Sequence, residues 1–403
     1  MSEWKEYRLS DIASIENKRR IPLNSQQRSE MQGSFPYYGA SGVVDYVNDY
    51  IFDGQYVLIS EDGENLRSRQ TPIAFLVDGQ FWVNNHAHIL KGNDELVNEF
   101  IVYYFQNLNI NPFIAGAVQP KLNLENLLSI PIFMPDREER LELTRLLNSL
   151  TRKIENLRKQ NETLEAIAQT LFKHWFVDFE FPNKDGKPYK SSGGEMERSE
   201  LGDIPVGWRV GKLGDFGKVI TGKTPSTQNP DYWGNGLPFI TPTDFKNYRK
   251  FVLNSEREIS KLAVLEFKNL IVPEKSVVVT CIGSDMEKVA RTATRCITNQ
   301  QLNSLVFCQI KHGIEYVYQF LVSQYKMLRL MALGGSTMPI INKTAFSNIE
   351  IVIPDLKTLD KFNEIIEPFN LKVINNEQQI QTLTKTRDVL LPQLMSGKLR
   401  ITE

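Results

Sequence analysis

The chain has 403 residues, enough for two or three domains of ordinary size, and 41% of them are hydrophobic, which supports folded cores. The composition argues against a signal peptide and a membrane span, since no basic segment precedes an apolar run and no stretch approaches about 18 apolar residues. We therefore expect a cytoplasmic protein. The formal net charge of −1 excludes a uniformly basic surface, so any nucleic-acid-binding surface must be local.

The chain can be aligned with itself once, with the matched residues in the same order. Trp4, Leu9 and Asp11 match Trp208, Leu213 and Asp215 at one constant offset. Further matches are Pro36 with Pro238, Asn85 with Asn299, Pro120 with Pro339, Asn123 with Asn342, and residues 130–136 with residues 349–355. Each copy ends with a predicted strand and a Pro-Asp turn, so the sequence predicts two similar domains.

A leucine heptad follows the first copy, at Leu143, Leu150, Leu157, Leu164 and Leu171. The same spacing returns after the second copy, and it predicts two long coiled-coil helices. Asn161 and Asn376 each interrupt the apolar stripe. A buried asparagine is satisfied only opposite a polar partner, which predicts two helices that meet in one alignment. Pro368 should bend the second helix.

Together these patterns predict an α+β fold with two pseudo-symmetric domains separated by two long antiparallel coiled-coil helices. The predicted boundaries are a first domain at 1–135, a central helix at 136–180, a linker at 181–204, a second domain at 205–354 and a C-terminal helix at 355–397. Helices of this length would extend about 60 Å at 1.5 Å per residue. If each domain faces one duplex, the chain would recognise two half-sites with a fixed spacer.

Charge differs between the two copies. Residues 205–354 carry 18 Lys and Arg against 11 Asp and Glu, whereas residues 1–135 carry 10 against 16, so the second copy has the charge of a DNA-binding domain. Candidate DNA contacts in the first copy are Lys18, Arg19, Arg20, Arg67, Arg69 and Lys121. Those in the second copy are Lys223, Thr224, Lys246, Arg249, Lys250, Lys288, Arg291, Arg295 and Lys343. Several of these lie in stretches that look too polar for a core, and a solvated surface is the alternative.

Amide side chains that could form paired hydrogen bonds with adenine lie in matching stretches of the two copies. They are Asn84, Asn85, Asn299, Gln300 and Gln301. A turn at the end of a strand is the alternative role. The loops Gln119 to Asn123 and Ser336 to Asn342, each before the closing strand of a copy, are candidate DNA-facing turns.

Motifs for catalysis are missing from the sequence. Asn111-Pro112-Phe113 lacks the second proline of an adenine methyltransferase loop, and Gly222-Lys223-Thr224 matches only the end of a phosphate-binding loop. His86 and His88 lack a third metal ligand, so packing or polar contact is the expected role. We therefore predict no catalytic centre, no bound cofactor and no metal site in this chain.

Two segments resemble the repeated helix ends of type I restriction-modification specificity subunits: AIAQTLFKHWFVDFEF from Ala166 and TRDVLLPQLMSGKL from Thr386. The segments IPVGWRVGKLGDF and TGKTPST resemble the start of that family's target-recognition domains. The resemblance implies a DNA-reading subunit without activity of its own, which recognises a split, asymmetric sequence in double-stranded DNA.

The resemblance also implies partners. It predicts two methyltransferase subunits, which contact the long helices and use S-adenosylmethionine to methylate adenine at N6. It also predicts two motor-nuclease (restriction) subunits with ATP and Mg. Three alternatives stay open: an enzyme with a fused activity, a protein–protein scaffold that reads no DNA, and an accessory subunit of a methyltransferase outside type I systems.

Overall fold

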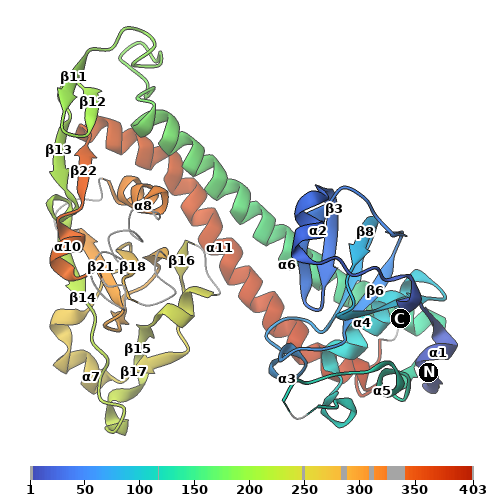
Figure 1. The fold of residues 1–403 in the computed structure, drawn as a ribbon. Helices are drawn as coiled ribbons and strands as arrows, with labels where there is room; N and C mark the ends of the chain where they lie inside the picture. The colour runs from blue at the N-terminus through green and yellow to red at the C-terminus, as the bar shows by residue number, and fades with distance from the viewer. Residues whose placement is uncertain are drawn as a thin grey trace. The chain divides into compact units, whose positions relative to one another are not determined.

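The computed structural model describes residues 3–116, 118–246, 250–282, 288–307, 313–324 and 341–401. The chain forms two compact units, Met1–Glu155 with Gln381–Glu403, and Asn156–Ile380. Each unit combines a domain of mixed helices and strands with parts of both long helices (Figure 1). Each unit therefore contains parts of more than one of the segments predicted from the sequence.

The first domain contains two four-stranded sheets. One sheet is antiparallel, with the order β2 (Ala13–Ile15), β9 (Ala87–Gly92), β6 (Tyr56–Ser60) and β7 (Ala74–Val77). The other sheet has the order β4 (Gly42–Val47), β3 (Gln32–Gly39), β8 (Gln80–Val83) and β5 (Phe52–Asp53), and β3 and β8 run parallel. A separate pair joins β1 (Lys5–Arg8) to β10 (Pro131–Met134). The helices are α1 (Leu9–Ile12), α2 (Ser25–Glu30), α3 (Asn65–Ser68), α4 (Glu95–Asn107) and α5 (Leu124–Leu128).

The second domain has a five-stranded sheet and a three-stranded sheet. The larger sheet has the order β14 (Gly217–Thr221), β21 (Leu302–Phe307), β18 (Val277–Thr280), β19 (Val289–Thr292) and β16 (Phe251–Val252). The smaller has the order β17 (Arg257–Ile259), β15 (Trp233–Ile240) and β20 (Ile297–Thr298), with β15 and β20 parallel. A separate pair joins β13 (Arg209–Lys212) to β22 (Glu350–Ile353). The helices are α7 (Lys261–Glu266), α8 (Ile314–Ser323) and α10 (Lys343–Ser347).

The order β2-β9-β6-β7 recurs as β14-β21-β18-β19, and the parallel pair β3–β8 recurs as β15–β20. The duplication predicted from the sequence is therefore present in the topology. The matched residues at the start of each copy have matched roles, since Leu9 and Leu213 are both fully buried. Asp11 accepts the backbone N–H of Arg8 at 3.0 Å, and Asp215 accepts that of Lys212 at 3.3 Å.

Two long helices follow the domains, α6 (Arg137–Phe172) and α11 (Leu356–Met395). Both begin where the sequence predicts, because Asp136 and Asp355 each accept a backbone N–H of the first turn at 3.0 Å. The start of α6 packs with the end of α11 in the first unit, and the reverse holds in the second unit. The helices therefore run antiparallel.

The two asparagines of the apolar stripes meet inside the second unit. Asn376 donates its side-chain N–H to the side-chain oxygen of Asn161 at 2.8 Å, and both residues are buried. Asn161 in turn donates to Glu377 at 2.7 Å. The predicted pairing of polar groups within the seam is confirmed.

Proline does not interrupt α11, which is continuous across Pro368. Figure 1 shows a change of direction in the N-terminal part of this helix, as expected for a helix that lacks one backbone hydrogen bond. The helix ends at Met395. Gly397, two residues further on, has a φ of +68°, which favours glycine, and a side chain at this position would meet the ring of Trp4.

The segment 181–204, expected to be a linker, contains regular structure. A π-helical turn (Lys173–Val177) follows α6, and β11 (Met196–Ser199) and β12 (Gly202–Pro205) form a hairpin. Phe181 stacks on Tyr189 at 4.6 Å and on Trp208 at 4.9 Å. This aromatic contact fixes a stretch whose polar, glycine-rich composition indicated a flexible connection.

Candidate nucleic-acid interface

Four segments of the first domain meet beside the antiparallel sheet β2-β9-β6-β7. They are residues 17–20 after β2, residues 61–63 after β6, the turn 84–88 leading into β9, and residues 120–122 before α5. The backbone N–H of Glu61 donates to the carbonyl of His86 at 2.9 Å, and that of Leu122 donates to the carbonyl of Glu61 at 2.8 Å. We call these segments the first loop cluster.

The second domain repeats this arrangement with the same two bonds. The N–H of Cys281 donates to the carbonyl of Gln301 at 2.8 Å, and that of Ile341 donates to the carbonyl of Cys281 at 3.0 Å. The segments are residues 221–224, 281–282, 298–303 and 341–343, which we call the second loop cluster. Candidate positions that are far apart in sequence are thus brought together in each domain.

These bonds correct the sequence alignment by one residue. Asn84 and Asn299 are the equivalent asparagines, because their N–H groups donate to the ends of β3 and β15, each at 3.0 Å. Their side-chain oxygens accept the N–H two residues further on, that of His86 at 2.8 Å and that of Gln301 at 3.1 Å. Matching Asn85 to Asn299 was therefore wrong.

The same contacts show how these two side chains are used in the fold. Asn299 is only 6% exposed, and both asparagines hold the turn that follows one strand and leads into the next; a strand-end turn was the alternative to base contact. Gln301 also takes part, since its side chain accepts a hydrogen bond from Asn299 at 2.9 Å. The exposed amides at the tips of the two turns are Asn85 and Gln300, which occupy equivalent positions.

His88 ties the first loop cluster together. It is 1% exposed, donates from Nε2 to the carbonyl of Leu122 at 2.7 Å, and accepts at Nδ1 from the side chain of Asn17 at 2.9 Å. Burial lowers the pKa of the His88 imidazole. Its role is polar contact within the fold, as expected, whereas His86 pairs with Asp62 at 2.9 Å.

Asn303 takes the place of His88 in the second loop cluster. It donates to the carbonyl of Ile341 at 2.9 Å and accepts from the hydroxyl of Thr221 at 2.6 Å. Sequence reasoning overlooked this equivalence. The alternation in His86-Ala-His88 against Gln301-Leu-Asn303 was the signal that could have revealed it.

Two of the candidate arginines in the first domain form hydrogen bonds within the domain. Arg20 donates to Glu61 at 2.7 Å and to the carbonyl of Ala87 at 2.9 Å. Arg69 donates to the carbonyls of Phe105 and Leu108 at the end of α4, and burial lowers the pKa of its guanidinium. Both side chains use donors in these contacts within the fold, which leaves fewer of them for a phosphate.

The remaining candidates of the first domain are more accessible. Lys18 is exposed, and the exposed Arg67 donates to the carbonyl of Gly116 at 2.9 Å. Arg19 donates to the carbonyl of Ile51 at 2.7 Å and covers a phenylalanine ring. Lys121 is half exposed, with its ammonium 3.5 Å from Glu61.

Two candidates of the second domain are buried, which corrects the expectation that their stretches are too polar for a core. Lys250 is 4% exposed and lies 2.6 Å from Glu315, and Arg291 is 2% exposed and lies 2.8 Å from the same carboxylate. Lys250 also contacts Glu165 of α6 at 3.1 Å. A duplex cannot reach either cation, so neither is a phosphate contact.

Other candidates of the second domain lie at its surface. Lys223 is exposed above the ring of Phe267, and the hydroxyl of Thr224 donates to Gln300 at 2.6 Å. Arg295 and Lys343 are exposed, and Lys288 is half-buried. Arg249, the side chain of Lys246 and residues 336–340 of the second candidate turn lie outside the described residues.

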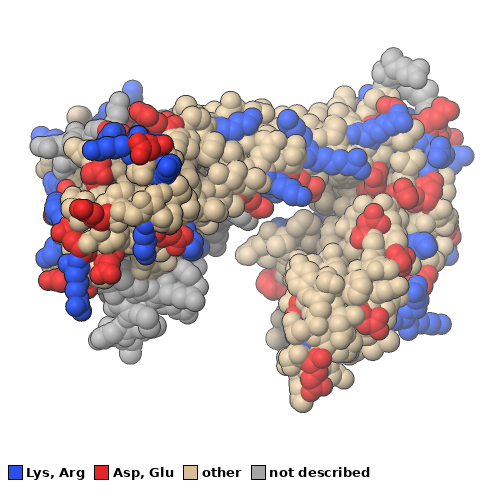
Figure 2. All heavy atoms as spheres, turned by 90° about the horizontal axis from the view of Figure 1, so that it is seen from above, with Lys and Arg blue, Asp and Glu red and all other residues tan. Residues whose placement is uncertain are grey.

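Basic and acidic side chains are interspersed on the surface in the view of Figure 2. No broad basic face appears there, in agreement with the net charge of the chain. Within the described ranges, no group of three His, Cys, Asp or Glu side chains is placed to hold a metal ion. Nor does any described helix have the length and apolar content needed to cross a bilayer.

Comparison with known proteins identifies the family. The model of the type I restriction modification DNA specificity domain matches residues 1–166 and 205–385. The chain is 26% identical to the HindI specificity subunit of Haemophilus influenzae, over 99% of this chain and all of that protein. It is 28% identical to the MjaIX specificity subunit of Methanocaldococcus jannaschii, over 100% of this chain and 94% of that protein.

A solved structure shares the fold. The type I restriction-modification S subunit from M. genitalium superposes with a TM-score of 0.64 at 11% sequence identity, covering 98% of this chain and 96% of that one. The family model matches both copies of the internal repeat, whose topologies also agree. The chain therefore belongs to the type I restriction-modification DNA specificity family.

Proposed function

We propose that this chain reads a split, asymmetric sequence in double-stranded DNA, with each domain recognising one half. The observation that carries the proposal is the repeated loop cluster, built with the same backbone bonds in two domains whose chain continues into paired helices. The named relatives are specificity subunits of type I restriction enzymes, which supports the same function for this chain.

The accessible side chains of the loop clusters divide by chemistry. Asn85 and Gln300 carry amides at equivalent turn tips, and an amide can form two hydrogen bonds with the major-groove edge of adenine. Cations nearby would contact phosphates, which position the protein on the duplex without reading sequence. The exposed cations proposed for this role are Lys18, Arg67, Lys121, Lys223, Arg295 and Lys343.

The chemistry would belong to partner subunits. Methyltransferase subunits would carry S-adenosylmethionine and methylate adenine, and motor-nuclease subunits would use ATP and Mg. In this chain burial raises the pKa of Cys281 and of Cys296 to about 12, which makes both thiols poor nucleophiles. A scaffold that binds protein alone is the competing function, and an accessory subunit of another methyltransferase is a third.

Mapping of methylated adenines tests the proposal directly. The chain is expressed with its candidate methyltransferase partner, and the modified adenines of the host genome are compared with those in cells that lack this chain. A split motif that appears only when both proteins are present is expected. A stable complex with an active methyltransferase but no motif would favour the protein scaffold.

Salt dependence provides a second test on the assembled complex. Phosphate contacts release counterions, so the logarithm of the binding constant should fall linearly with the logarithm of salt concentration, by about 0.9 per phosphate contacted. Six contacts would give a slope of about −5. An affinity that does not change with salt would overturn the DNA-binding function.

A further inference from the structure

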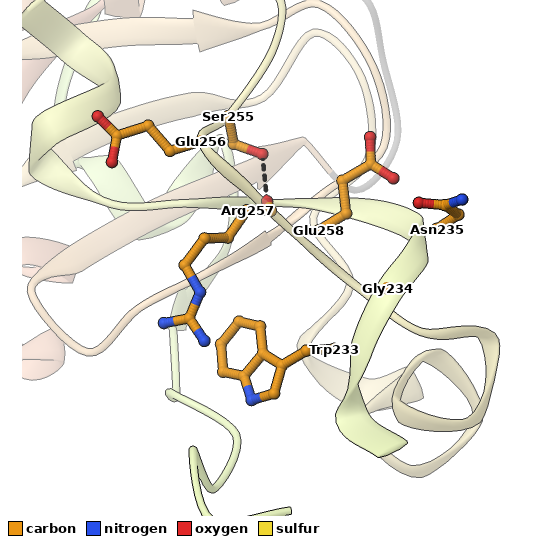
Figure 3. Close-up of a pocket in the computed structure, with 7 residues that line it drawn as sticks. All are labelled: Trp233, Gly234, Asn235, Ser255, Glu256, Arg257 and Glu258. Atoms are coloured by element: carbon orange, nitrogen blue, oxygen red, sulfur yellow. Dashed lines mark hydrogen bonds between the residues drawn. The ribbon is translucent and has the colours of Figure 1, made fainter. Parts of the chain in front are cut away.

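The second domain contains a cation that sequence reasoning did not select. Arg257 lies on β17, and the carbon of its guanidinium is 3.4 Å from the ring centroid of Trp233 on β15. Figure 3 shows the side chain of Arg257 leaning over the indole. Stacking of this kind holds the planar guanidinium in place and leaves its N–H groups free to bind.

Arg257 differs from the arginines that form ion pairs within the fold. Arg20 and Arg291 each lie within 2.8 Å of a carboxylate, whereas Arg257 is exposed and forms no ion pair in the described part of the chain. Its neighbours Glu256 and Glu258 point away from the guanidinium, as successive side chains of a strand do (Figure 3). The donors of Arg257 are therefore available to a ligand.

The Arg257–Trp233 stack is joined to the second loop cluster. The indole N–H of Trp233 donates to the carbonyl of Ser226 at 3.2 Å. Ser226 is two residues beyond Thr224, whose hydroxyl contacts Gln300 at the tip of the turn. One short segment thus connects the exposed amide proposed to read bases with the stacked guanidinium.

We propose that Arg257 reads a guanine in the half-site recognised by the second domain, an assignment that rests on the proposed function. Guanine presents two acceptors, O6 and N7, in the major groove, and they match the fork of a guanidinium. A phosphate would approach a strand that has a carboxylate on each side of Arg257, and both would repel it. The neutral edge of a base meets less repulsion.

The test uses the complex of the full chain with its methyltransferase partner and the duplex target found by methylation mapping. Each guanine of the target is replaced in turn by 7-deazaguanine, which lacks the N7 acceptor. For the unaltered complex, one replacement in one half-site should weaken binding by about 5- to 150-fold. Arg257→Ala should weaken binding to the natural duplex to a similar extent and should remove the sensitivity to that one replacement.

Two further variants separate the possible outcomes. Arg257→Lys keeps the charge but loses the planar fork that stacks on the indole and pairs with O6 and N7 together, so it should weaken binding and reduce the guanine sensitivity, whereas a phosphate contact would largely survive this change. Arg209→Ala removes an exposed arginine of the same domain that pairs with Asp215 at 3.1 Å, and it should retain the sensitivity.

The assignment would be overturned by a target without guanine in either half-site. It would also be overturned if Arg257→Ala left the affinity unchanged, lowered the affinity equally for every duplex, or kept the sensitivity to 7-deazaguanine. Failure of the proposed function looks different. In that case the unaltered complex would bind no specific duplex at all.

Discussion

Glu315 lies at the centre of a buried group of charges in the second unit. It accepts from Lys250 at 2.6 Å, from Arg291 at 2.8 Å and from Asn370 of α11 at 3.1 Å. Burial alone would raise the pKa of Glu315, but the positive charges of Lys250 and Arg291 outweigh it and hold that pKa below its ordinary value. These side chains are buried away from water, so each charge is stabilised mainly by the opposite charges beside it.

Glu315→Gln should destabilise the second unit strongly. The substitution leaves two buried cations with too little negative charge, and breaking a buried pair in this way costs about 3–5 kcal/mol. The loss would be measured as a decrease in the free energy of unfolding in urea. Glu367→Gln is the control, because Glu367 and Lys275 form an ion pair at 2.8 Å with both side chains more than 40% exposed, and such pairs contribute about 0–1 kcal/mol. Equal effects of the two substitutions would contradict this account.

His88 should make the first domain sensitive to mild acid. In the unfolded chain its pKa is about 6.5, and burial makes the folded value lower, so the unfolded state binds more protons between the two values. The contribution of the neutral His88 to the free energy of unfolding should therefore be fully present above about pH 6.5. It should decrease as the pH falls from about 6.5 toward the lower pKa of the folded state. Each kcal/mol lost lowers the melting temperature by about 2–4 °C in a domain of this size.

His88→Asn copies the arrangement of Asn303 without a titrating group. The difference in melting temperature between pH 7.5 and pH 5.5 should shrink in this variant, whatever its absolute stability. Glu61 lies nearby, but hydrogen bonding from Arg20 and nearby positive charges hold its pKa below the ordinary value despite burial, so it titrates at lower pH. An unchanged pH response in His88→Asn would show that other groups are responsible.

At this scale the sequence predicted candidates but could not separate accessible from buried cations. Lys250 and Arg291 stand in polar stretches, and nothing local shows that Glu315 will meet both from α8. The amides of residues 84–85 and 299–301 lie in the two loop clusters, yet only the hydrogen bonds show which of them form the turn. Arg257 was missed because its significance depends on Trp233, 24 residues earlier.

The elements predicted best were those whose apolar residues recur at a regular spacing along the chain. The start of each long helix follows from its Pro-Asp turn, and the heptad stripe with one asparagine in each helix follows from spacing, because helix packing repeats the same local geometry. That Asn161 and Asn376 contact each other is seen only in the structure. The segment 181–204 was predicted less well, since Phe181, Tyr189 and Trp208 hold it through contacts that no periodicity reveals.

The asparagine pair should behave as a buried hydrogen bond. Asn376→Leu leaves the side-chain oxygen of Asn161 without its donor and should cost about 1–3 kcal/mol. The double variant with leucine at both positions should recover most of that loss, because apolar groups then face each other. Asn375→Leu changes the exposed neighbour and should shift stability by less than about 0.5 kcal/mol. A double variant no more stable than Asn376→Leu would refute the pairing argument.

For the whole molecule, the duplicated topology matters more than the unequal charge of the copies. The first domain is net acidic by sequence and the second net basic, yet both build the same loop cluster. Part of the difference lies within the clusters, because Glu61 of the first corresponds to the neutral Cys281 of the second. Acidic charge used for internal contacts is compatible with a DNA-binding domain, so net charge alone is a weak guide to function here.

The helix pair should set the distance between the two half-sites. One heptad added to both helices, between Glu155 and Asn156 and between Ile380 and Gln381, preserves the apolar stripe and lengthens each helix by about 10 Å. That length equals about three base pairs, so methylation mapping should show the same two half-sites with a spacer about three base pairs longer. Three-residue insertions at the same points rotate the stripe out of register and should abolish assembly. An unchanged spacer with the heptad insertion would mean that the helices do not determine the separation, since the added length would then be absorbed without moving the domains along the duplex.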